Sequence, residues 1–396
     1  MITFGHRSLR AEVAKVAHRR PSFKKVGTNS SPFDLYLKLH DRFSHTYILE
    51  SVEGPEKLAE YSFIGFDPYS QIQIKNGAVE VKDKAKGEER FKTSDPLGVI
   101  KTLVEEEMVE EERFRLIGGA VGYVSYDAVR YFEDIPSETK DDLQYPDFEF
   151  AFYRDGVIFD HKSHQAYYYH VGEDRFTYLQ EALRASASDL DFDYSIDGFN
   201  VSGARYEEMV SQAKEYITAG DILQVVLSRR LDLGLKGDLL RFYKSLRQIN
   251  PSPYMYLLKM GERQIVGSSP EMLVRVDGRV VETFPIAGTR PILKDETENR
   301  RLCDELLKDP KDRAEHIMLV DLARNDVGRV AKYGTVQTPE LMTVHRFSHV
   351  QHIVSRVVGT LAKGYSCFDA LRSVFPAGTV SGAPKIRAME IIEELE

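Results

Sequence analysis

Residues 271–284 read EMLVRVDGRVVETF, two runs of alternating residues on either side of Asp277-Gly278. Aspartate followed by glycine favours the positive φ angles of a two-residue hairpin turn. The stretch therefore predicts a pair of antiparallel strands in which Val276 lies opposite Arg279.

The same register places one acid at the edge of the predicted sheet. Counting outward from the turn sets Glu271 opposite Phe284, and the loop PIAGTR (residues 285–290) leaves the sheet beside it. If burial raised its pKa toward neutral, this glutamate could act as a general acid, which contributes about 10²- to 10⁴-fold to a rate. The alternative is a glutamate that ends a strand and faces solvent.

Two more pairs of this kind lie in the first half of the chain. QIQIKNGAVEV (residues 71–81) contains Asn76-Gly77, and FYRDGVIF (residues 152–159) contains Asp155-Gly156. Both predict tight hairpins, so the first half should be rich in antiparallel strands.

The second half mixes helices with strands. Apolar residues recur at helical spacing over residues 205–219, and Gly220 is a suitable end for that helix. Further helices are predicted over residues 296–307 and from Asp309-Pro310, where a capping side chain precedes a first-turn proline. Strands are predicted over residues 221–233 and 349–359. This mixture predicts an α+β fold and not alternating βαβ units.

Composition and charge limit the classes of partner. The chain has 396 residues, 42% of them hydrophobic, and a net charge of -9, which argues against nucleic acid or an anionic membrane as the main partner. No apolar run approaches the ~20 residues of a membrane span. The two cysteines have no metal-binding spacing and fit a reduced, cytoplasmic setting. The small, polar and acidic stretch 185–200 predicts a boundary between two regions.

Two carboxylates are predicted to share one face of the helix that begins at Pro310. Asp312 and Glu315 are three residues apart, and Mg²⁺ prefers such oxygen ligands. Asp312 also lies in the first helical turn, where an acid is favoured by the helix dipole alone. Two acids by themselves do not specify a metal site.

Three histidines are close in sequence. His345, His349 and His352 suggest zinc, but the chain has no HExxH motif, and His349 and His352 would face opposite sides of a strand. A single acid–base histidine is more plausible than a zinc site, and an ordinary structural histidine is the default interpretation.

The segment PAGTVSGAPK (residues 376–385) has the appearance of a phosphate loop. It lacks the GxxxxGK[ST] order, and Pro384 stands where a phosphate loop needs a backbone N–H donor. We interpret it as a turn that leads into a helix.

Seven strings occur in order along the chain, and together they carry a family resemblance. They resemble the chorismate-binding domain shared by anthranilate synthase, aminodeoxychorismate synthase, isochorismate synthase and salicylate synthase. Residues 47–65 and 118–133 resemble the N-terminal region of the two aminating members, and the large subunits of anthranilate synthases are the best match. The strings are DILQVVLSRR, NPSPYMYLL, GSSPEMLVRV, FPIAGTRP, DRAEHIMLVDLARNDVGRV, HVQHIVSRVVG and FPAGTVSGAPKIRAMEIIEELE.

The resemblance implies a sandwich of large antiparallel sheets with helices packed outside, and it implies roles for site residues. Glu271 would protonate the departing 4-hydroxyl of chorismate. Gly288 and Thr289 would contact chorismate, and His352 would assist the later loss of pyruvate.

The resemblance also implies a metal cofactor and a type of reaction. Glu315 would bind Mg²⁺, with Asp312 helping through water. Water-adding relatives carry a lysine where this chain has Gln224, and a neutral amide cannot deprotonate water. Aminodeoxychorismate synthases often carry a nucleophilic lysine where this chain has Ala287. Both differences favour direct attack by ammonia at the ring carbon next to the carboxylate.

A tryptophan feedback pocket is implied as well. Ser51 together with Pro253, Tyr254 and Met255 matches the family's inhibitor site, so inhibition would be allosteric. These residues could instead serve only in packing between domains. Relatives usually have arginine where this chain has Glu60.

The implied organisation is an N-terminal region over residues 1–190 and a chorismate-binding domain over residues 200–396, with the tryptophan pocket shared by the first region and residues 250–256. The resemblance implies further segments after Glu396, with the remaining Mg²⁺ ligands and chorismate contacts; Glu393 and Glu396 are not those ligands. Ammonia would come from a glutamine amidotransferase subunit in a hetero-oligomer. The alternatives are an aminodeoxychorismate synthase and a non-catalytic module that binds tryptophan or a partner.

Overall fold

A computed structural model describes residues 2–4, 20–27, 30–51, 60–105, 113–184, 190–347 and 349–396. The chain divides into two compact units. The first comprises Met1–Ala128, Tyr145–Phe192 and Gly237–Pro270, and the second comprises Val129–Gln144, Asp193–Lys236 and Glu271–Glu396.

This division differs from the expected one in two segments. Residues 237–270 were expected in the chorismate-binding domain and belong to the first unit, whereas residues 129–144 belong to the second. Of the expected boundary stretch 185–200, residues 185–189 lie outside the described part of the chain.

The first unit is built on two antiparallel sheets. The six-stranded sheet has the order β1 (Ile2–Phe4), β8 (Gly119–Val124), β9 (Phe148–Tyr153), β5 (Ser70–Lys75), β6 (Ala78–Asp83), β7 (Gly87–Lys92). The seven-stranded sheet has the order β16 (Arg263–Ser269), β15 (Tyr254–Met260), β3 (His45–Glu50), β4 (Tyr61–Phe66), β10 (Asp155–Asp160), β11 (Gln165–His170), β2 (Ser22–Val26).

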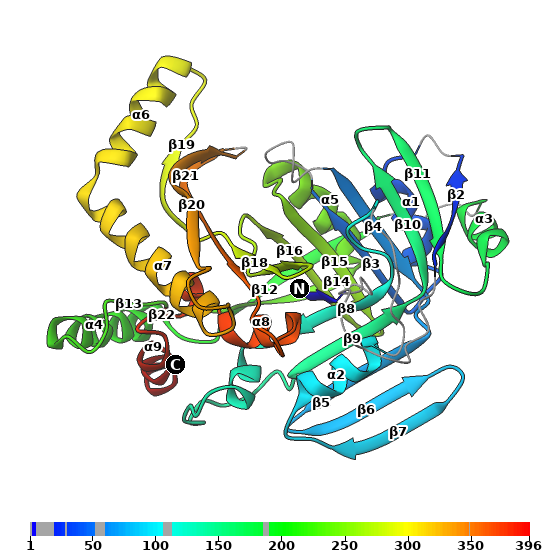
Figure 1. Ribbon diagram of the computed structural model, residues 1–396, viewed down its shortest axis with the longest axis horizontal. Coiled ribbons are helices and arrows are strands. Elements are labelled where there is room, and N and C mark those ends of the chain that lie inside the picture. The colour runs from blue at the N-terminus through cyan, green and yellow to red at the C-terminus, as the bar shows by residue number, and fades with distance from the viewer. Residues whose placement is uncertain are drawn as a thin grey trace. The chain divides into compact units, whose positions relative to one another are not determined.

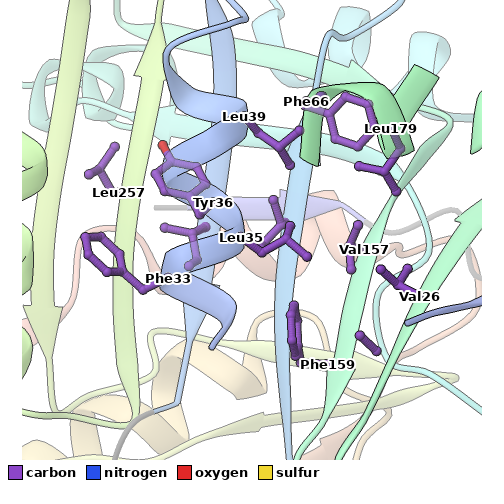
Figure 2. Packing of buried hydrophobic residues seen from close by; sticks show 14 of the residues in the cluster. Val26, Phe33, Leu35, Tyr36, Leu39, Phe66, Val157, Phe159, Leu179 and Leu257 are labelled. Atoms are coloured by element: carbon purple, nitrogen blue, oxygen red, sulfur yellow. The ribbon is translucent and has the colours of Figure 1, made fainter. Parts of the chain in front are cut away.

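The two sheets enclose one core, and helices cover the other face of the seven-stranded sheet. Tyr47 and Leu258 of that sheet pack with Val121 and Tyr153 of the six-stranded sheet. The covering helices supply a second core, with α1 at its centre (Figure 2). The helices of this unit are α1 (Pro32–His40), α2 (Pro96–Glu105), α3 (Phe176–Arg184) and α5 (Leu239–Ile249).

The second unit contains an antiparallel sheet flanked by two long helices, α6 (Glu296–Lys308) and α7 (Pro310–Gly328), which run along β19 and β21 (Figure 1). The sheet has the order β17 (Arg275–Asp277), β18 (Val280–Thr283), β21 (Val350–Thr360), β19 (Ile286–Pro291), and β20 (Gln337–Arg346) also pairs with β21. Two short ribbons pair β12 (Phe192–Phe199) with β14 (Leu231–Gly237) and β13 (Gln224–Val225) with β22 (Gly382–Ala383). The other helical segments are α4 (Gly203–Ala219), α8 (Cys367–Val374), α9 (Lys385–Leu395) and the 3₁₀ turns η1 (Tyr126–Tyr131) and η2 (Gly378–Val380).

The α+β prediction with large antiparallel sheets is confirmed, and so are several elements. Asn76 and Gly77 both have positive φ, 49° and 73°, and β5 pairs with β6 around them. α4 ends at Gly220, whose φ is 86°. α7 begins after Asp309, which accepts hydrogen bonds from the backbone N–H groups of Lys311 and Asp312. α6, β21 and the helix after Pro384 also form as predicted.

The hairpin predicted at Asp155-Gly156 is wrong. β9 lies in the six-stranded sheet and β10 in the seven-stranded sheet, so the chain changes sheets at this point. The Asp155 carboxylate is buried and accepts hydrogen bonds from Tyr168 Oη at 2.9 Å and Arg175 Nε at 2.9 Å. The strands on either side are buried on both faces, which hides the alternation that marks a solvent-facing hairpin.

The register predicted for the third hairpin is also wrong. Asp277 pairs with Val280, so Gly278 and Arg279 form the turn, and Gly278 has φ 58°. A turn of this kind needs positive φ only at its first residue. Glu271 therefore precedes β17 and does not lie opposite Phe284.

The strand predicted over residues 221–233 is interrupted. Within this range, only β13 and the first residues of β14 form strands. Arg230, which lies between them, binds Asp142 at 2.7 Å and Asp232 at 2.7 Å. Among the described residues, no helix is long and apolar enough to cross a membrane.

Candidate functional site

Glu271 lies in a small hollow of the second unit. The hollow measures about 30 Å³ and is lined by residues from α7, β18 and the loop before η2. Thr379 Oγ1 donates a hydrogen bond to Glu271 Oε2 at 3.0 Å. Burial raises the pKa of Glu271 to about 7, against the lowering effect of Thr379. A pKa in this range suits a general acid at neutral pH.

One face of α7 extends from this hollow toward the start of the helix. Leu319, Leu322 and Asp326 line the hollow, and Asp312 and Glu315 precede them at spacings of three and four residues. Side chains at such spacings lie on one side of a helix. The helix therefore carries both the wall of the Glu271 hollow and the two predicted metal-binding acids.

Gly288 and Thr289 lie beside the start of the same helix. Gly288 has φ 71°, and a Cβ atom there would lie 2.9 Å from Leu306 Cδ1 and 3.4 Å from Asp312 Cβ. The strand register shifts between Ala287 and Thr289, which accommodates this backbone. The position therefore requires glycine.

His352 lies across the sheet from this glycine. Its Nδ1 is 3.0 Å from Gly288 O and 3.1 Å from Thr289 Oγ1. The carbonyl oxygen of Gly288 can only accept a hydrogen bond, whereas the Thr289 hydroxyl can donate or accept one. His345 pairs with His352 in the adjacent strand β20.

The two acids of α7 have different surroundings. Arg290 Nη1 binds Asp312 Oδ2 at 3.0 Å. Glu315, by contrast, makes no hydrogen bond or ion pair with any residue that the structure describes. The described residues also contain no cluster of three or more potential metal ligands. Because Mg²⁺ is commonly held by one or two carboxylates plus water and substrate, Glu315 fits a single-ligand role and Asp312 fits less well.

Gln224 and Ala287 both belong to the second unit. Gln224 pairs with Ala383 in the β13–β22 ribbon, four residues after Thr379. Ala287 is buried and pairs with Ile353. The short segment 379–383 thus runs from the partner of Glu271 to β22, the strand that pairs with Gln224.

Sequence reasoning missed two residues that line the hollow, Thr379 and Asp326, and the lysine that binds one of them. Thr379 was included only in a turn motif, and Asp326 and Lys385 were not singled out. Lys385 Nζ binds Asp326 Oδ2 at 2.7 Å and Val374 O at 2.9 Å, and both side chains are buried. The lysine in SGAPK, which follows a proline at a helix start, was the available signal.

The residues of the predicted tryptophan pocket come together in the first unit. Ser51 Oγ donates to Pro253 O at 2.7 Å, and Met255 pairs with Glu50 across β15 and β3. Tyr254 begins β15 beside them. Glu60, where relatives usually have arginine, forms an ion pair with Arg115 at 3.1 Å.

The glutamates near the end of the chain do not resemble free metal ligands. Glu393 is buried, and its carboxylate accepts hydrogen bonds from Arg130 Nη2 at 2.7 Å and from the backbone N–H of Thr139 at 2.7 Å. It anchors the segment 129–144 to α9.

The sequence pattern of the chorismate binding enzyme family matches residues 44–396, which is most of the chain. The chain belongs to this family. Glu271, Gly288, Thr289, Glu315 and His352 therefore lie within a chorismate-using enzyme.

Relatives with established names agree. The chain is 48% identical to anthranilate synthase component 1 of Methanothermobacter thermautotrophicus over 365 residues, which covers 92% of this chain and 77% of that protein. It is 39% identical to aminodeoxychorismate synthase component 1 of Bacillus subtilis, over 96% of this chain and 83% of that protein. The crystal structure of anthranilate synthase component I from Streptococcus pneumoniae is similar with a TM-score of 0.75 and 35% identity, over 87% of this chain and 78% of that chain.

Proposed function

We propose that this chain is the aminating subunit of an anthranilate synthase. The reaction converts chorismate and ammonia into anthranilate, pyruvate and water, and it would begin tryptophan biosynthesis. The observation that carries the proposal is the combination of a buried acid with a pKa of about 7, Glu271, and neutral side chains at positions 224 and 287. The names of the relatives support it.

In the first step, ammonia attacks the ring carbon next to the carboxylate. The ring double bonds shift, and the 4-hydroxyl group leaves as water with a proton from Glu271. Gln224 cannot act as a base for water, so a nucleophile that needs no activation is favoured. Ala287 offers no amine that could attack the ring in place of ammonia.

In the second step, the pyruvyl group leaves and the ring becomes aromatic. A base must remove the proton from the ring carbon that carries the new amine, while pyruvate departs with another proton. His352 is the proposed base, because a neutral imidazole that donates from Nδ1 to Gly288 O would present Nε2 as the proton acceptor.

We propose Mg²⁺ as the cofactor, with Glu315 as one ligand. Bound there, the ion would offset the charge of a substrate carboxylate. Asp312 would act at most indirectly, since Arg290 binds its carboxylate.

We also propose a partner and an inhibitor. Ammonia would come from glutamine through an amidotransferase subunit in a cytoplasmic hetero-oligomer. Tryptophan would bind the Ser51–Pro253 region of the first unit and inhibit allosterically.

An aminodeoxychorismate synthase is the second candidate, because one close relative carries that name. That enzyme would keep the pyruvyl group and place the amine at the 4-position. Ala287 argues against it, since this chain has no lysine at that point of the loop.

The test is to supply the full-length enzyme with chorismate, Mg²⁺ and an ammonium salt at alkaline pH. A fluorescent product with the mass of anthranilate, formed together with pyruvate, is expected. A product that retains the pyruvyl group would replace the first candidate with the second. No amination of chorismate would end both, and tryptophan binding without turnover would then support a binding module.

A further inference from the structure

The hydroxyl group of Thr379 lies on a short segment that is fixed at both ends. Gly378 packs against α7 so closely that a Cβ atom would lie 2.1 Å from Leu322 Cδ2. Ser381 Oγ donates to Ala377 O at 2.8 Å, and Ser381 O accepts from the backbone N–H of Val226 at 2.9 Å. Thr379 therefore has little freedom to move relative to α7 or to β13.

The bond from Thr379 to Glu271 distinguishes the two oxygens of one carboxyl group. Thr379 Oγ1 donates to Oε2 at 3.0 Å. An oxygen that accepts this bond is favoured as the unprotonated one, so a proton on this carboxyl group is favoured on Oε1. The hollow, at about 30 Å³, has room for one or two water molecules.

Few charged groups surround the hollow, so the hydrogen bond from Thr379 has a major influence on Glu271. The other titratable side chain that lines it is Asp326 of α7, and Lys385 of α9 binds that carboxylate at 2.7 Å. No lysine, arginine or histidine is among the residues that line the hollow. Burial raises the pKa of Glu271, and the hydrogen bond from Thr379 acts against that effect.

We propose that Thr379 is a positioning residue that holds Glu271 Oε2 and thereby directs the proton on Oε1 toward the departing hydroxyl group of the substrate. The catalytic part of this inference rests on the proposed function. The hydrogen bond itself does not, and it can be tested without turnover.

The chain offers a matched control for the test. Thr283 lines the same hollow, but its Oγ1 donates to the backbone carbonyl of Leu273 at 2.7 Å. T379V and T283V each remove one hydroxyl group from the hollow at nearly constant volume, and only T379V removes a bond to Glu271. T379S restores the hydroxyl group, and T379A serves as a second variant if T379V fails to fold.

The first measurement is the pKa of Glu271 in the free enzyme, by ¹³C NMR of protein labelled at the glutamate carboxyl carbon, with E271Q identifying the signal. Losing a donor to the charged form should lower the acid dissociation constant about tenfold in T379V. T379S and T283V should keep the wild-type pKa. Equal pKa values in T379V and T283V would overturn the inference.

The second measurement is kcat and KM for chorismate at a fixed concentration of free ammonia. T379V should lower kcat about tenfold or more with little change in KM, and T379S should recover most of the loss. A T379V enzyme with wild-type kcat contradicts the positioning role. If the wild-type enzyme does not aminate chorismate, the proposed function fails, and the NMR titration still decides whether Thr379 controls Glu271.

Discussion

Replacing Lys385 with methionine should destabilise the second unit in a way that depends on pH. Lys385 Nζ binds Asp326 Oδ2 at 2.7 Å, and Lys385 and Asp326 are only 8% and 9% exposed. Burial raises the pKa of Asp326 and lowers the pKa of Lys385, so the mutual attraction only partly offsets the loss of solvation. Without the lysine, Asp326 must be buried as an unpaired anion or take up a proton.

The loss of stability in K385M follows from the free energy needed to protonate Asp326. Holding an aspartate of normal pKa near 3.9 in the protonated form at pH 7 costs about 1.36 × 3.1, or roughly 4 kcal/mol. The same step at pH 5 costs only about 1.5 kcal/mol. In K385M the folded-state pKa of Asp326 is raised further, so the folded form is favoured at low pH and loses stability as the pH rises from the unfolded pKa toward the folded one. The variant should therefore be about 2 to 3 kcal/mol closer to wild type at pH 5 than at pH 7.

Urea unfolding of the full-length enzyme at both pH values measures this difference. The control is the double variant D326L/K385M, which leaves no buried charge at this place and should lose most of the pH dependence. Val374 O loses the Lys385 hydrogen bond in both variants, so this loss cancels in the comparison. If K385M costs the same at pH 5 and pH 7, or if the double variant shows the same pH dependence, the pair does not carry the buried charges that the geometry indicates.

Four further outcomes follow from the site. At a fixed concentration of free ammonia, wild-type kcat/KM should fall as the pH rises through about 7, because the protonated form of Glu271 is the active one. E271Q should lower kcat by about 10²- to 10⁴-fold and remove this pH dependence. G288A should lower stability by about 1–2 kcal/mol in thermal unfolding and raise KM for chorismate, since φ is 71° and the Cβ space is occupied. E315Q should weaken Mg²⁺ binding in calorimetry with chorismate present, whereas D312N should change it much less. S51A should keep catalytic activity and lose tryptophan inhibition, because the bond to Pro253 O fixes the end of β3.

The sequence correctly predicted turns and helix ends that depend only on the residues at that point of the chain. Asn76-Gly77 forms its turn, Gly220 ends its helix, and Asp309 caps the next one, because each needs only nearby backbone atoms. Asp155-Gly156 has the same local signal and failed. There the Asp155 carboxylate is buried and binds Tyr168 and Arg175. These contacts with residues farther along the chain determine the backbone conformation at this point.

The candidate site shows the same division between local and distant causes. The sequence and its resemblance singled out Glu271, although the hairpin register used to place it was displaced, because the turn takes Gly278 and Arg279. The register error matters little to the chemistry, since the environment of Glu271 comes from α7 and from residues 377–379, far along the chain.

Pairing between distant segments also explains why Asp312 and Glu315 differ. Their spacing predicted that both acids share one face of a helix, and α7 contains both. Nothing local indicated that Arg290, two residues after Gly288 in the bulged strand β19, would bind Asp312, while Glu315 has no cationic partner among the described residues. The close approach of Gly288 to Asp312 brings this arginine and the helix together. The glycine that the resemblance assigned to substrate contact therefore also helps to determine which of the two carboxylates Arg290 binds.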